Sequence, residues 1–221
     1  MLIIGAKGHA KELLQNFHDN NDLKNLFFYD DVSADIPELL FNKFKILRSL
    51  DEAKELFENL DRRYVLGVGS PHVRFKLSKK MNSIGGQLSS VITKNVEIGS
   101  YSVIIGNGVH IMSGTIITND IIIGDGVLIN LDCTIGHDSY IGNYCELSPG
   151  VHISGHVRVD DFSSLGTGAV VIPGIKIGKN CIIGAGSVVN KNIPDNSVAV
   201  GVPAKVIKEN EPIEEWYEYY S

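Results

Sequence analysis

The sequence predicts a mixed fold, in which a small α/β (Rossmann-like) domain precedes a parallel β-helix of hexapeptide repeats. The β-helix is predicted by a period of six, because every sixth residue from Ile105 to Val189 is isoleucine, leucine or valine. Neither an α-helix nor an ordinary strand selects for this spacing. Hexapeptide repeats are typical of parallel β-helices, in which each short strand adds one large aliphatic side chain to a stacked interior.

The α/β domain is expected over residues 1–85, where strands and helices alternate. Three short apolar strands are predicted at residues 2–4, 26–29 and 64–68. Ser49 and Glu52 predict the capped start of one helix, and Pro71 predicts the start of another. This alternation is typical of a parallel sheet, which has its ligand-binding turns at the carboxyl ends of the strands.

The β-helix is expected over residues 86–208. Three hexads form one turn, so the fifteen aliphatic positions supply about five turns. Ile92 and Ile98 precede the series one residue out of register, which predicts a single inserted residue before Ile105. Seven members of the series are followed directly by glycine, which we expect to supply open backbone angles at the corners. Residues 209–221 form an acidic and aromatic tail, as either a short docked helix or a loose segment.

The composition is that of an ordinary soluble protein, with 43% hydrophobic residues, 21% charged residues and a net charge of −6. This acidic balance argues against nucleic acid or an anionic membrane surface as a partner. The apolar runs are too short to cross a bilayer, and the first residues lack the pattern of a signal peptide. We therefore expect a cytoplasmic protein without membrane insertion.

The three cysteines are too few for a disulfide framework. Cys133, Cys145 and Cys181 each lie two residues before a member of the aliphatic series. Small or β-branched residues fill the equivalent positions of the other hexads. The cysteines are therefore expected to pack inward and not to act as ligands or nucleophiles.

His137 is the strongest catalytic candidate. It follows Ile135 by two residues, at an outward corner of a coil. An imidazole has a pKa suited to removing a proton near neutral pH. The neighbouring Asp138 is expected to orient the ring and stabilise its cationic form. The alternative is an ordinary solvent-facing histidine at a turn.

Steps of one full turn, which is three hexads, align further residues with these corners. Gly155 lies one coil after His137, where the missing side chain leaves room for a thioester and the backbone N–H can bind an oxyanion. The neighbouring column contains Pro149, Thr167 and Ala185, small residues along which a pantetheine arm can lie.

Four motifs resemble the hexapeptide-repeat sugar acyltransferases, the family of nucleotide-4-aminosugar N-acetyltransferases and sialic acid O-acetyltransferases. These motifs are Gly5–Ala10, Asp30–Asp31, Ile135–Asp138 and Gly201–Lys205. The resemblance implies a left-handed β-helix and a homotrimer with its active site at the subunit interface. It also implies metal-free acetyl transfer from acetyl-CoA to the C4 amine of a UDP- or dTDP-linked 4-amino-4,6-dideoxysugar, for bacterial surface glycan synthesis. The alternative acceptor is a hydroxyl of sialic acid or of another sugar.

The resemblance further implies where acetyl-CoA binds. The expected contacts are Gly155, Thr167, Gly184 and Ala185. Lys191 and Lys205 are expected either near the phosphates of the cofactor or as solvated surface lysines. Glu146 is a departure, because it stands where the family often has a second histidine that contacts acetyl-CoA.

The nucleotide sugar is expected in the α/β domain, where the turn residues that match the family are Lys7, Gly8 and His9. Backbone N–H groups at the start of a helix suit phosphate oxygens. Asp30 and Asp31 end the second strand and either accept hydrogen bonds from a base or ribose or form a strand-ending turn. Gly69 ends the third strand on the same rim.

Two other classes of protein are considered. Carbonic anhydrase-like β-helices bind zinc through three histidines, and His152 and His156 invite this interpretation. They lie at different points of the repeat from His137, so convergence on one metal is not expected. A non-catalytic trimeric scaffold would leave the pair of His137 and Asp138 without a purpose.

Overall fold

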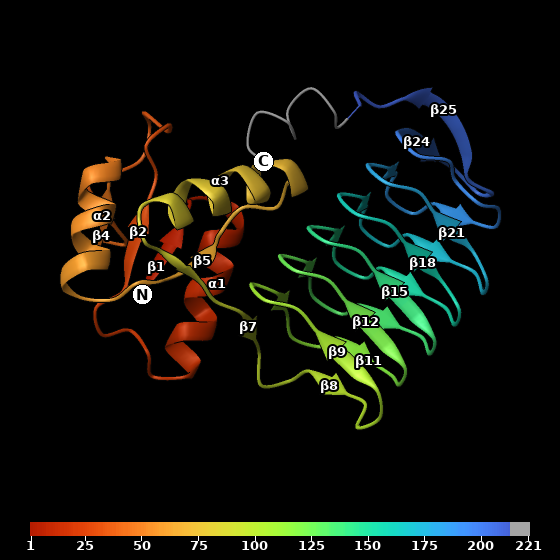
Figure 1. The fold of residues 1–221 in the computed structure, drawn as a ribbon, viewed down its shortest axis with the longest axis horizontal. Coiled ribbons are helices and arrows are strands. Elements are labelled where there is room, and N and C mark those ends of the chain that lie inside the picture. The colour runs from red at the N-terminus through yellow and green to blue at the C-terminus, as the bar shows by residue number, and fades with distance from the viewer. Residues whose placement is uncertain (213–221) are drawn as a thin grey trace. The chain divides into compact units, whose positions relative to one another are not determined.

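The computed structural model describes residues 1–212 and divides the chain into two compact units (Figure 1). The first unit contains residues 1–69 and 73–90. The second contains residues 70–72 and continues from Val91. Among the described residues, no helix is long and apolar enough to cross a membrane.

The first unit is built on a six-stranded sheet with the order β3-β4-β2-β1-β5-β6. Its strands are β1 (Leu2–Ile4), β2 (Phe27–Tyr29), β3 (Leu39–Leu40), β4 (Phe44–Leu47), β5 (Arg63–Leu66) and β6 (Gln87–Leu88). Neighbouring strands are parallel except β3 and β4. The helices are α1 (Gly8–Asp19), α2 (Leu50–Asn59) and α3 (Pro71–Ser83). The predicted small α/β domain is therefore confirmed.

The capping box predicted for α2 is present. The Ser49 hydroxyl accepts a hydrogen bond from the Glu52 N–H at 3.2 Å, and the Glu52 carboxylate accepts one from the Ser49 N–H at 3.2 Å. The helix then buries Ala53, Leu56 and Phe57 in a core that it shares with β1, β2 and β5. Strands β3, β4 and β6 are elements that the sequence pattern does not predict.

The second unit is a β-helix with three faces, each of them a sheet of short strands (Figure 1). The first face contains β7 (Val91–Ile92), β10 (His110–Ile111), β13 (Leu128–Ile129), β16 (Glu146–Leu147), β19 (Ser164–Leu165), β22 (Ile182–Ile183), β24 (Ser197–Val200) and β25 (Lys205–Glu209). The second face contains β8 (Glu97–Ile98), β11 (Ile116–Ile117), β14 (Thr134–Ile135), β17 (His152–Ile153), β20 (Val170–Val171) and β23 (Val188–Val189). The third face contains β9 (Val103–Ile105), β12 (Ile121–Ile123), β15 (Ser139–Ile141), β18 (Arg158–Val159) and β21 (Lys176–Ile177).

Strand pairing confirms the turn of three hexads and the predicted insertion. Ile111 pairs with Ile129, which stands three full hexads further along the chain. Ile92 pairs with Ile111 and Ile98 pairs with Ile117, and each of these pairs spans one residue more than three hexads. The extra residue therefore lies after Ile98, as the shift in the hexad series indicates.

The β-helix ends in an antiparallel pair. Ile183 pairs with Ala199, where a full turn would end at Gly201, so the last coil is shortened. Strand β24 continues the first face, and β25 returns alongside it. The segment Gly201–Lys205 contains the turn that joins them. Residues 213–221 of the predicted tail lie outside the described residues.

The glycines that follow the aliphatic series do not have the open backbone angles expected of them. Positive φ occurs two residues further on, as at Gly108, Asp138 and Tyr144, with φ of 67°, 57° and 54°. At Gly106 and Gly142, a Cβ would lie 2.5 Å from a carboxylate oxygen of the next coil. That expectation was wrong because close stacking of the coils, and not backbone conformation, requires glycine there.

The aliphatic series packs into one continuous interior. Cys133, Cys145 and Cys181 lie in this interior and are fully buried, which confirms that they pack inward. Burial raises the pKa of Cys133 to about 11 and also raises the pKa of the other two thiols. None of the three is ionised near neutral pH.

Candidate active site

His137 lies on the corner that joins the second face of the β-helix to the third. It follows β14 through Gly136, and 60% of its side chain is exposed. Asp138 has the left-handed conformation that turns each coil at this corner. The corner therefore presents the imidazole and the carboxylate together, both accessible from solvent.

The two side chains form a short hydrogen bond. His137 Nδ1 lies 2.6 Å from Asp138 Oδ2. Because an ionised carboxylate only accepts hydrogen bonds, Nδ1 carries the proton and donates it. This hydrogen bond holds the pKa of Asp138 below its usual value, so the carboxylate is ionised at neutral pH. The other ring nitrogen, Nε2, then has the lone pair that can accept a proton.

Gly155 lies one coil further on, beside the Cε1 and Nε2 atoms of the His137 ring. A Cβ at Gly155 would lie 2.7 Å from both Cε1 and Nε2 of His137. A Cβ at Gly136 would lie 2.7 Å from the Gly155 nitrogen. The Gly155 N–H donates no hydrogen bond to any residue in the described part of the chain. Two glycines thus leave an open amide beside the imidazole.

Ser139 fixes this corner from inside. Its buried hydroxyl lies 3.3 Å from the His137 carbonyl oxygen and 3.2 Å from the Ser154 carbonyl oxygen. The same hydroxyl accepts a hydrogen bond from the Val157 N–H at 3.2 Å. Ser139 therefore ties the coil of His137 to the coil of Gly155, a role that its place among the small inward residues does not reveal.

His156 joins the pair, contrary to the expectation from the repeat. Its Nε2 lies 3.7 Å from Asp138 Oδ2, and its ring meets the His137 ring nearly at right angles with the centroids 5.0 Å apart. The expectation failed because Asp138 and His156 occupy equivalent corner positions in adjacent coils, so their side chains leave the coils together. His152 stays apart from this cluster on β17, with Nδ1 3.0 Å from Thr134 Oγ1.

The residues expected to bind acetyl-CoA divide between two corners. Gly155 and Lys191 lie on the corner of His137, with Lys191 three coils further on. Thr167, Gly184 and Ala185 lie on the corner that joins the first face to the second, with Thr167 and Ala185 exposed. These corners bound opposite edges of the second face, so a single chain does not bring the two sets together.

Lys205 and Glu146 lie on the first face. Lys205 begins β25 and is exposed. Glu146 lies in β16, half-buried, between Leu128 and Ser164 of the adjacent strands. Glu146 is therefore on a different face from the corner of His137.

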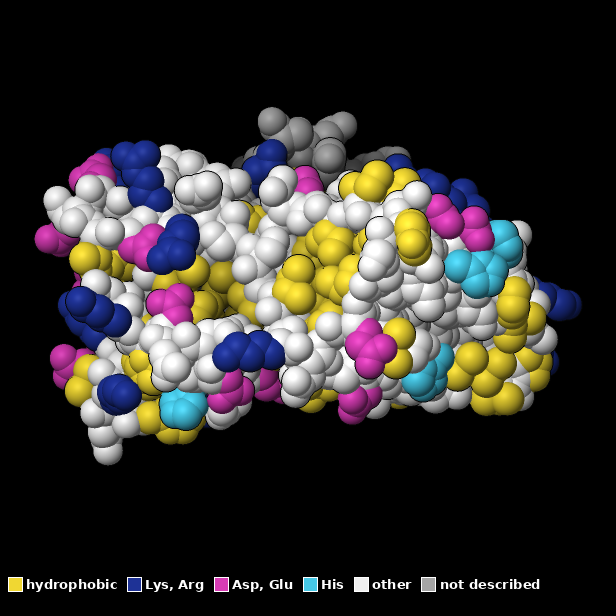
Figure 2. Space-filling model, turned by 90° about the horizontal axis from the view of Figure 1, so that it is seen from below, with side chains coloured by type: hydrophobic (Ala, Val, Ile, Leu, Met, Phe, Trp, Pro, Cys, Tyr) yellow, Lys and Arg dark blue, Asp and Glu magenta, His cyan; other side chains and the backbone are white. Residues whose placement is uncertain are grey.

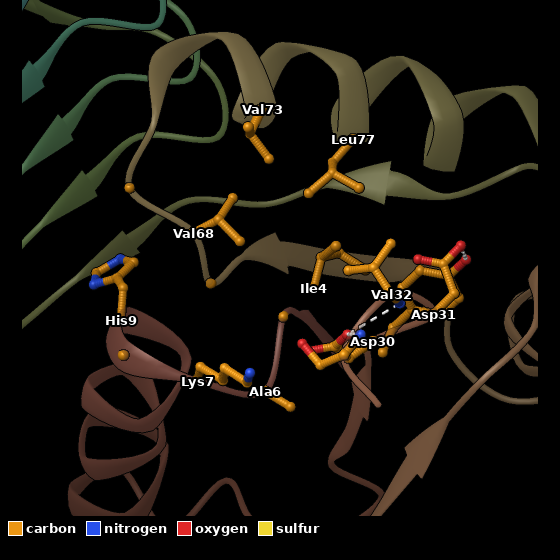
Figure 3. Close-up of a pocket in the computed structure, with 16 residues that line it drawn as sticks. Ile4, Ala6, Lys7, His9, Asp30, Asp31, Val32, Val68, Val73 and Leu77 are labelled. Atoms are coloured by element: carbon orange, nitrogen blue, oxygen red, sulfur yellow. Dashed lines mark hydrogen bonds between the residues drawn. The ribbon is translucent and has the colours of Figure 1, made fainter. Parts of the chain in front are cut away.

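A separate pocket lies within the first unit at the carboxyl ends of β1, β2 and β5 (Figure 3). Its volume is about 430 Å³. All six residues predicted for the nucleotide sugar line it: Lys7, Gly8, His9, Asp30, Asp31 and Gly69. Figure 3 shows Val68, Val73 and Leu77 on the side opposite Lys7 and Ala6, so apolar side chains form much of the wall.

The start of α1 forms one end of this pocket. Lys7 is the N-cap residue, and it forms no side-chain capping hydrogen bond. The first N–H groups of a helix lack acceptors in a preceding turn, so they suit an anion. The Lys7 ammonium lies 2.7 Å from Asp35 Oδ1, in an exposed ion pair.

The two aspartates at the end of β2 have different environments. Asp30 is buried, and its Oδ1 accepts hydrogen bonds from the backbone N–H groups of Val32 and Ser33 at 3.2 and 2.8 Å. Asp30 thus forms the strand-ending turn (Figure 3). Asp31 accepts a hydrogen bond from the Tyr29 hydroxyl at 2.8 Å and pairs with Lys80. Burial opposes its ionisation, but these partners outweigh burial and lower the pKa of Asp31.

His9 lies in the first turn of α1 with only 7% of its side chain exposed. Its Nδ1 is 3.0 Å from Glu12 Oε2. Burial lowers the pKa of His9 despite this carboxylate. The imidazole that lines the pocket is therefore neutral at neutral pH.

Two arginines organise the walls of the pocket, and the sequence pattern does not identify Arg48. Arg48 donates hydrogen bonds to the carbonyl oxygens of Asp30, Ser33 and Ile36 at 2.8 to 3.2 Å, which fixes the loop after β2. Arg74 is fully buried and donates to the carbonyl oxygens of Leu66 and Val68. Both support backbone that lines the pocket.

Comparison with known families identifies both units. Residues 1–81 match the PglD N-terminal domain, and residues 156–191 match the bacterial transferase hexapeptide of six repeats. A comparison with curated proteins finds no match.

Solved structures similar to this chain include three proteins from different organisms. A histidine-to-asparagine mutant of perosamine N-acetyltransferase from Caulobacter crescentus, in complex with CoA and GDP-perosamine, is 32% identical, with a TM-score of 0.86 over 94% of this chain and 96% of that one. WeeI from Acinetobacter baumannii is 28% identical, with a TM-score of 0.84 over 93% and 98% of the two chains. The acetyltransferase domain of PglB from Neisseria gonorrhoeae, in complex with acetyl coenzyme A, is 27% identical, with a TM-score of 0.81 over 93% and 98%.

These matches identify the chain as a hexapeptide-repeat acetyltransferase. The chain belongs to the PglD-type family of hexapeptide-repeat sugar N-acetyltransferases. It is a sugar N-acetyltransferase that uses acetyl-CoA.

Proposed function

We propose that this protein transfers the acetyl group of acetyl-CoA to the C4 amine of a nucleotide-linked 4-amino-4,6-dideoxysugar. UDP and dTDP are the nucleotides that the family resemblance implies, and GDP joins them because the 32% identical Caulobacter enzyme was solved in complex with GDP-perosamine. The product is a 4-acetamido sugar nucleotide for a bacterial surface glycan, made in the cytoplasm. The reaction needs no metal.

His137 acts as the general base. The amine nitrogen attacks the thioester carbonyl carbon, and His137 Nε2 takes the proton that the amine loses. The Nδ1–H···Asp138 hydrogen bond of 2.6 Å selects the tautomer of the neutral ring that has its lone pair on Nε2, and it stabilises the imidazolium afterwards. When the tetrahedral intermediate collapses, the C–S bond breaks and the imidazolium returns its proton to the departing thiolate of CoA.

The Gly155 amide stabilises the oxyanion of that intermediate. Support comes from its open N–H and from the 2.7 Å gap that separates a Cβ position at Gly155 from the His137 ring. A backbone donor that is already fixed before the reaction stabilises developing charge without reorganisation. Removal of one such donor typically costs about 10²–10³ in kcat.

The nucleotide sugar binds in the pocket of the first unit. The diphosphate lies at the start of α1, where the uncapped N–H groups and the Lys7 ammonium favour negative charge. Its arrival breaks the exposed ion pair of Lys7 with Asp35. Asp31 is the better acceptor for the base or ribose, because 27% of its side chain is exposed, whereas Asp30 is buried. The neutral His9 lies beside the diphosphate and sugar.

Acetyl-CoA runs along the corner of Thr167, Gly184 and Ala185, with its phosphates toward Lys191 and Lys205. A homotrimer explains how this corner reaches His137, since the two lie on opposite edges of the second face in one chain. The cofactor corner of one chain then lies against the His137 corner of its neighbour. Exposed apolar residues support such assembly: Ile104 and Ile122 are adjacent on the third face, 61% and 45% exposed.

The observation that carries this function is the His137–Asp138 pair against an open glycine amide. A panel assay tests it. Purified protein is mixed with acetyl-CoA and with UDP-, dTDP- or GDP-linked 4-amino-4,6-dideoxysugars in turn, and the release of the CoA thiol measures acetyl transfer. Free sialic acid and CMP-sialic acid are included to test O-acetylation. We expect transfer to at least one 4-aminosugar nucleotide and none to sialic acid. Transfer to sialic acid alone would overturn the proposed acceptor.

A further inference from the structure

Three side chains with metal-binding atoms converge at the His137 corner. His137, Asp138 and His156 each offer one ligand atom, and these atoms lie within 4.8 Å of one another. Asp138 Oδ2 is shared, 2.6 Å from His137 Nδ1 and 3.7 Å from His156 Nε2. Figure 2 shows histidine side chains directly beside acidic ones on one face of the molecule.

We propose that His137, Asp138 and His156 bind a divalent transition-metal ion of the Zn²⁺ class. Two imidazoles and one carboxylate form a donor set typical of zinc, which binds nitrogen and oxygen at about 2.0–2.2 Å in a tetrahedron. Donors around such an ion lie about 3.3–3.5 Å from one another, by the same bond lengths. The observed 2.6 and 3.7 Å bracket this separation for the two pairs that include Asp138, and the two histidine nitrogens lie within 4.8 Å of each other, so side-chain rotations complete the site.

The side chains are free to make these rotations. They are 60%, 47% and 64% exposed for His137, Asp138 and His156. Their backbone is held firmly, because the His156 N–H donates to the His137 carbonyl oxygen at 2.8 Å and joins the two coils. Three protein ligands leave the fourth position of the tetrahedron to water.

A metal bound here blocks acetyl transfer, an inference that rests on the proposed function of His137. Coordination through Nε2 occupies the lone pair that the base needs. Coordination through Nδ1 moves the ring proton to Nε2, which then donates and cannot accept. Either mode removes the base, so the ion is an inhibitor and not a cofactor.

The binding test uses the full chain without an affinity tag, stripped of metal with a chelator. Calorimetry with ZnCl₂ and visible absorption with CoCl₂ measure affinity, stoichiometry and coordination. We expect one ion per chain with the intense absorption of tetrahedral Co²⁺. His156→Asn is the test variant, since asparagine tolerates the left-handed backbone at this position. We expect it to weaken binding about tenfold or more.

His152→Asn is the matched control, because His152 is a nearby exposed histidine that bonds to Thr134 and lies outside the cluster. It should bind zinc like the unaltered protein. No zinc binding by the unaltered protein, or equal binding by His156→Asn, would overturn the proposal.

Inhibition is measured as the ratio of turnover with and without added ZnCl₂ for each protein. The ratio should fall for the unaltered protein and for His152→Asn, recover with EDTA, and stay near one for His156→Asn. Equal inhibition of all three would refute inhibition through this site. Failure of the proposed function has a different signature: no transfer to any sugar by metal-free protein, with zinc binding still dependent on His156.

Discussion

Replacement of Gly155 by alanine tests the geometry of the active site with the smallest possible side chain. Gly155 has no left-handed backbone angle, so alanine brings no backbone strain. Its Cβ would lie 2.7 Å from His137 Cε1 and Nε2, whereas ordinary contact begins at 3.4 Å. The ring must therefore retreat by several tenths of an ångström. A displacement of about 1 Å in a reacting group costs about 10²-fold in rate.

We therefore expect Gly155→Ala to lower kcat about 10²-fold, with little change in the Michaelis constant of the nucleotide sugar. The amide N–H is kept, so the loss reports on the imidazole. Stability should change little, because the exposed ring can swing into solvent. Steady-state kinetics of CoA release and chemical denaturation measure both quantities.

A double-mutant cycle identifies the cause of the loss. If Gly155→Ala acts by displacing His137, the variant with both Gly155→Ala and His137→Ala should be no slower than His137→Ala alone. Pro173→Ala, one coil further along the same corner, is the matched control and should retain normal turnover. Unchanged kcat in Gly155→Ala, or additive losses in the double variant, would refute the reasoning.

Three further predictions concern the pocket and the cysteines. Asp31→Asn removes a charged acceptor from the pocket. In steady-state assays it should raise the Michaelis constant of the nucleotide sugar about tenfold at similar kcat. The control Asp51→Asn on α2 should change neither quantity. Because burial lowers the pKa of His9, the contribution of His9 to folding stability is complete above its unfolded pKa of about 6.5 and declines below that pH. Chemical denaturation at pH 7.5 and 5.5 measures the free energy of unfolding, which should depend less on pH in His9→Gln than in the unaltered protein. Cys133, Cys145 and Cys181 should react with a thiol reagent only after unfolding, since all three are buried with raised pKa values.

Each of these has a contrary result. An unchanged Michaelis constant in Asp31→Asn would remove Asp31 from the binding site. Equal pH dependence in His9→Gln and the unaltered protein would mean that His9 does not titrate differently on folding. Rapid reaction of a thiol in the folded protein would contradict the packed interior.

The β-helix is predictable from the sequence because its rule is local. One aliphatic side chain in every hexad determines the coil, and the shift at Ile98 is enough to locate an inserted residue. Strands β3 and β6 escape prediction because each has only two residues, too few to show an alternating pattern. The reason for the glycines was not predictable either. A Cβ at Gly106 would clash with Asp125, which belongs to the next coil, and a local sequence pattern does not describe contacts between coils.

Parts of the candidate site were predictable, because a single rule of the repeat or of the sheet places them. The step of one full turn aligns Gly155 with His137, and the strand ends identify the residues that line the pocket. His156 was misjudged because it stands one position beyond a full turn from His137, while its side chain meets Asp138 from the equivalent corner. Arg48 is hidden for another reason: its partners are backbone carbonyl groups, which no residue pattern identifies.

The central claim is that His137 is the base of the acetyl transfer. The most direct measurement is kcat of His137→Asn at saturating acetyl-CoA and the best nucleotide sugar, with His152→Asn as control. The account predicts a loss of about 10²-fold or more for His137→Asn and normal turnover for His152→Asn. A His137→Asn enzyme that turns over within about twofold of the unaltered protein would contradict it, since general acid–base catalysis contributes about 10²–10⁴-fold.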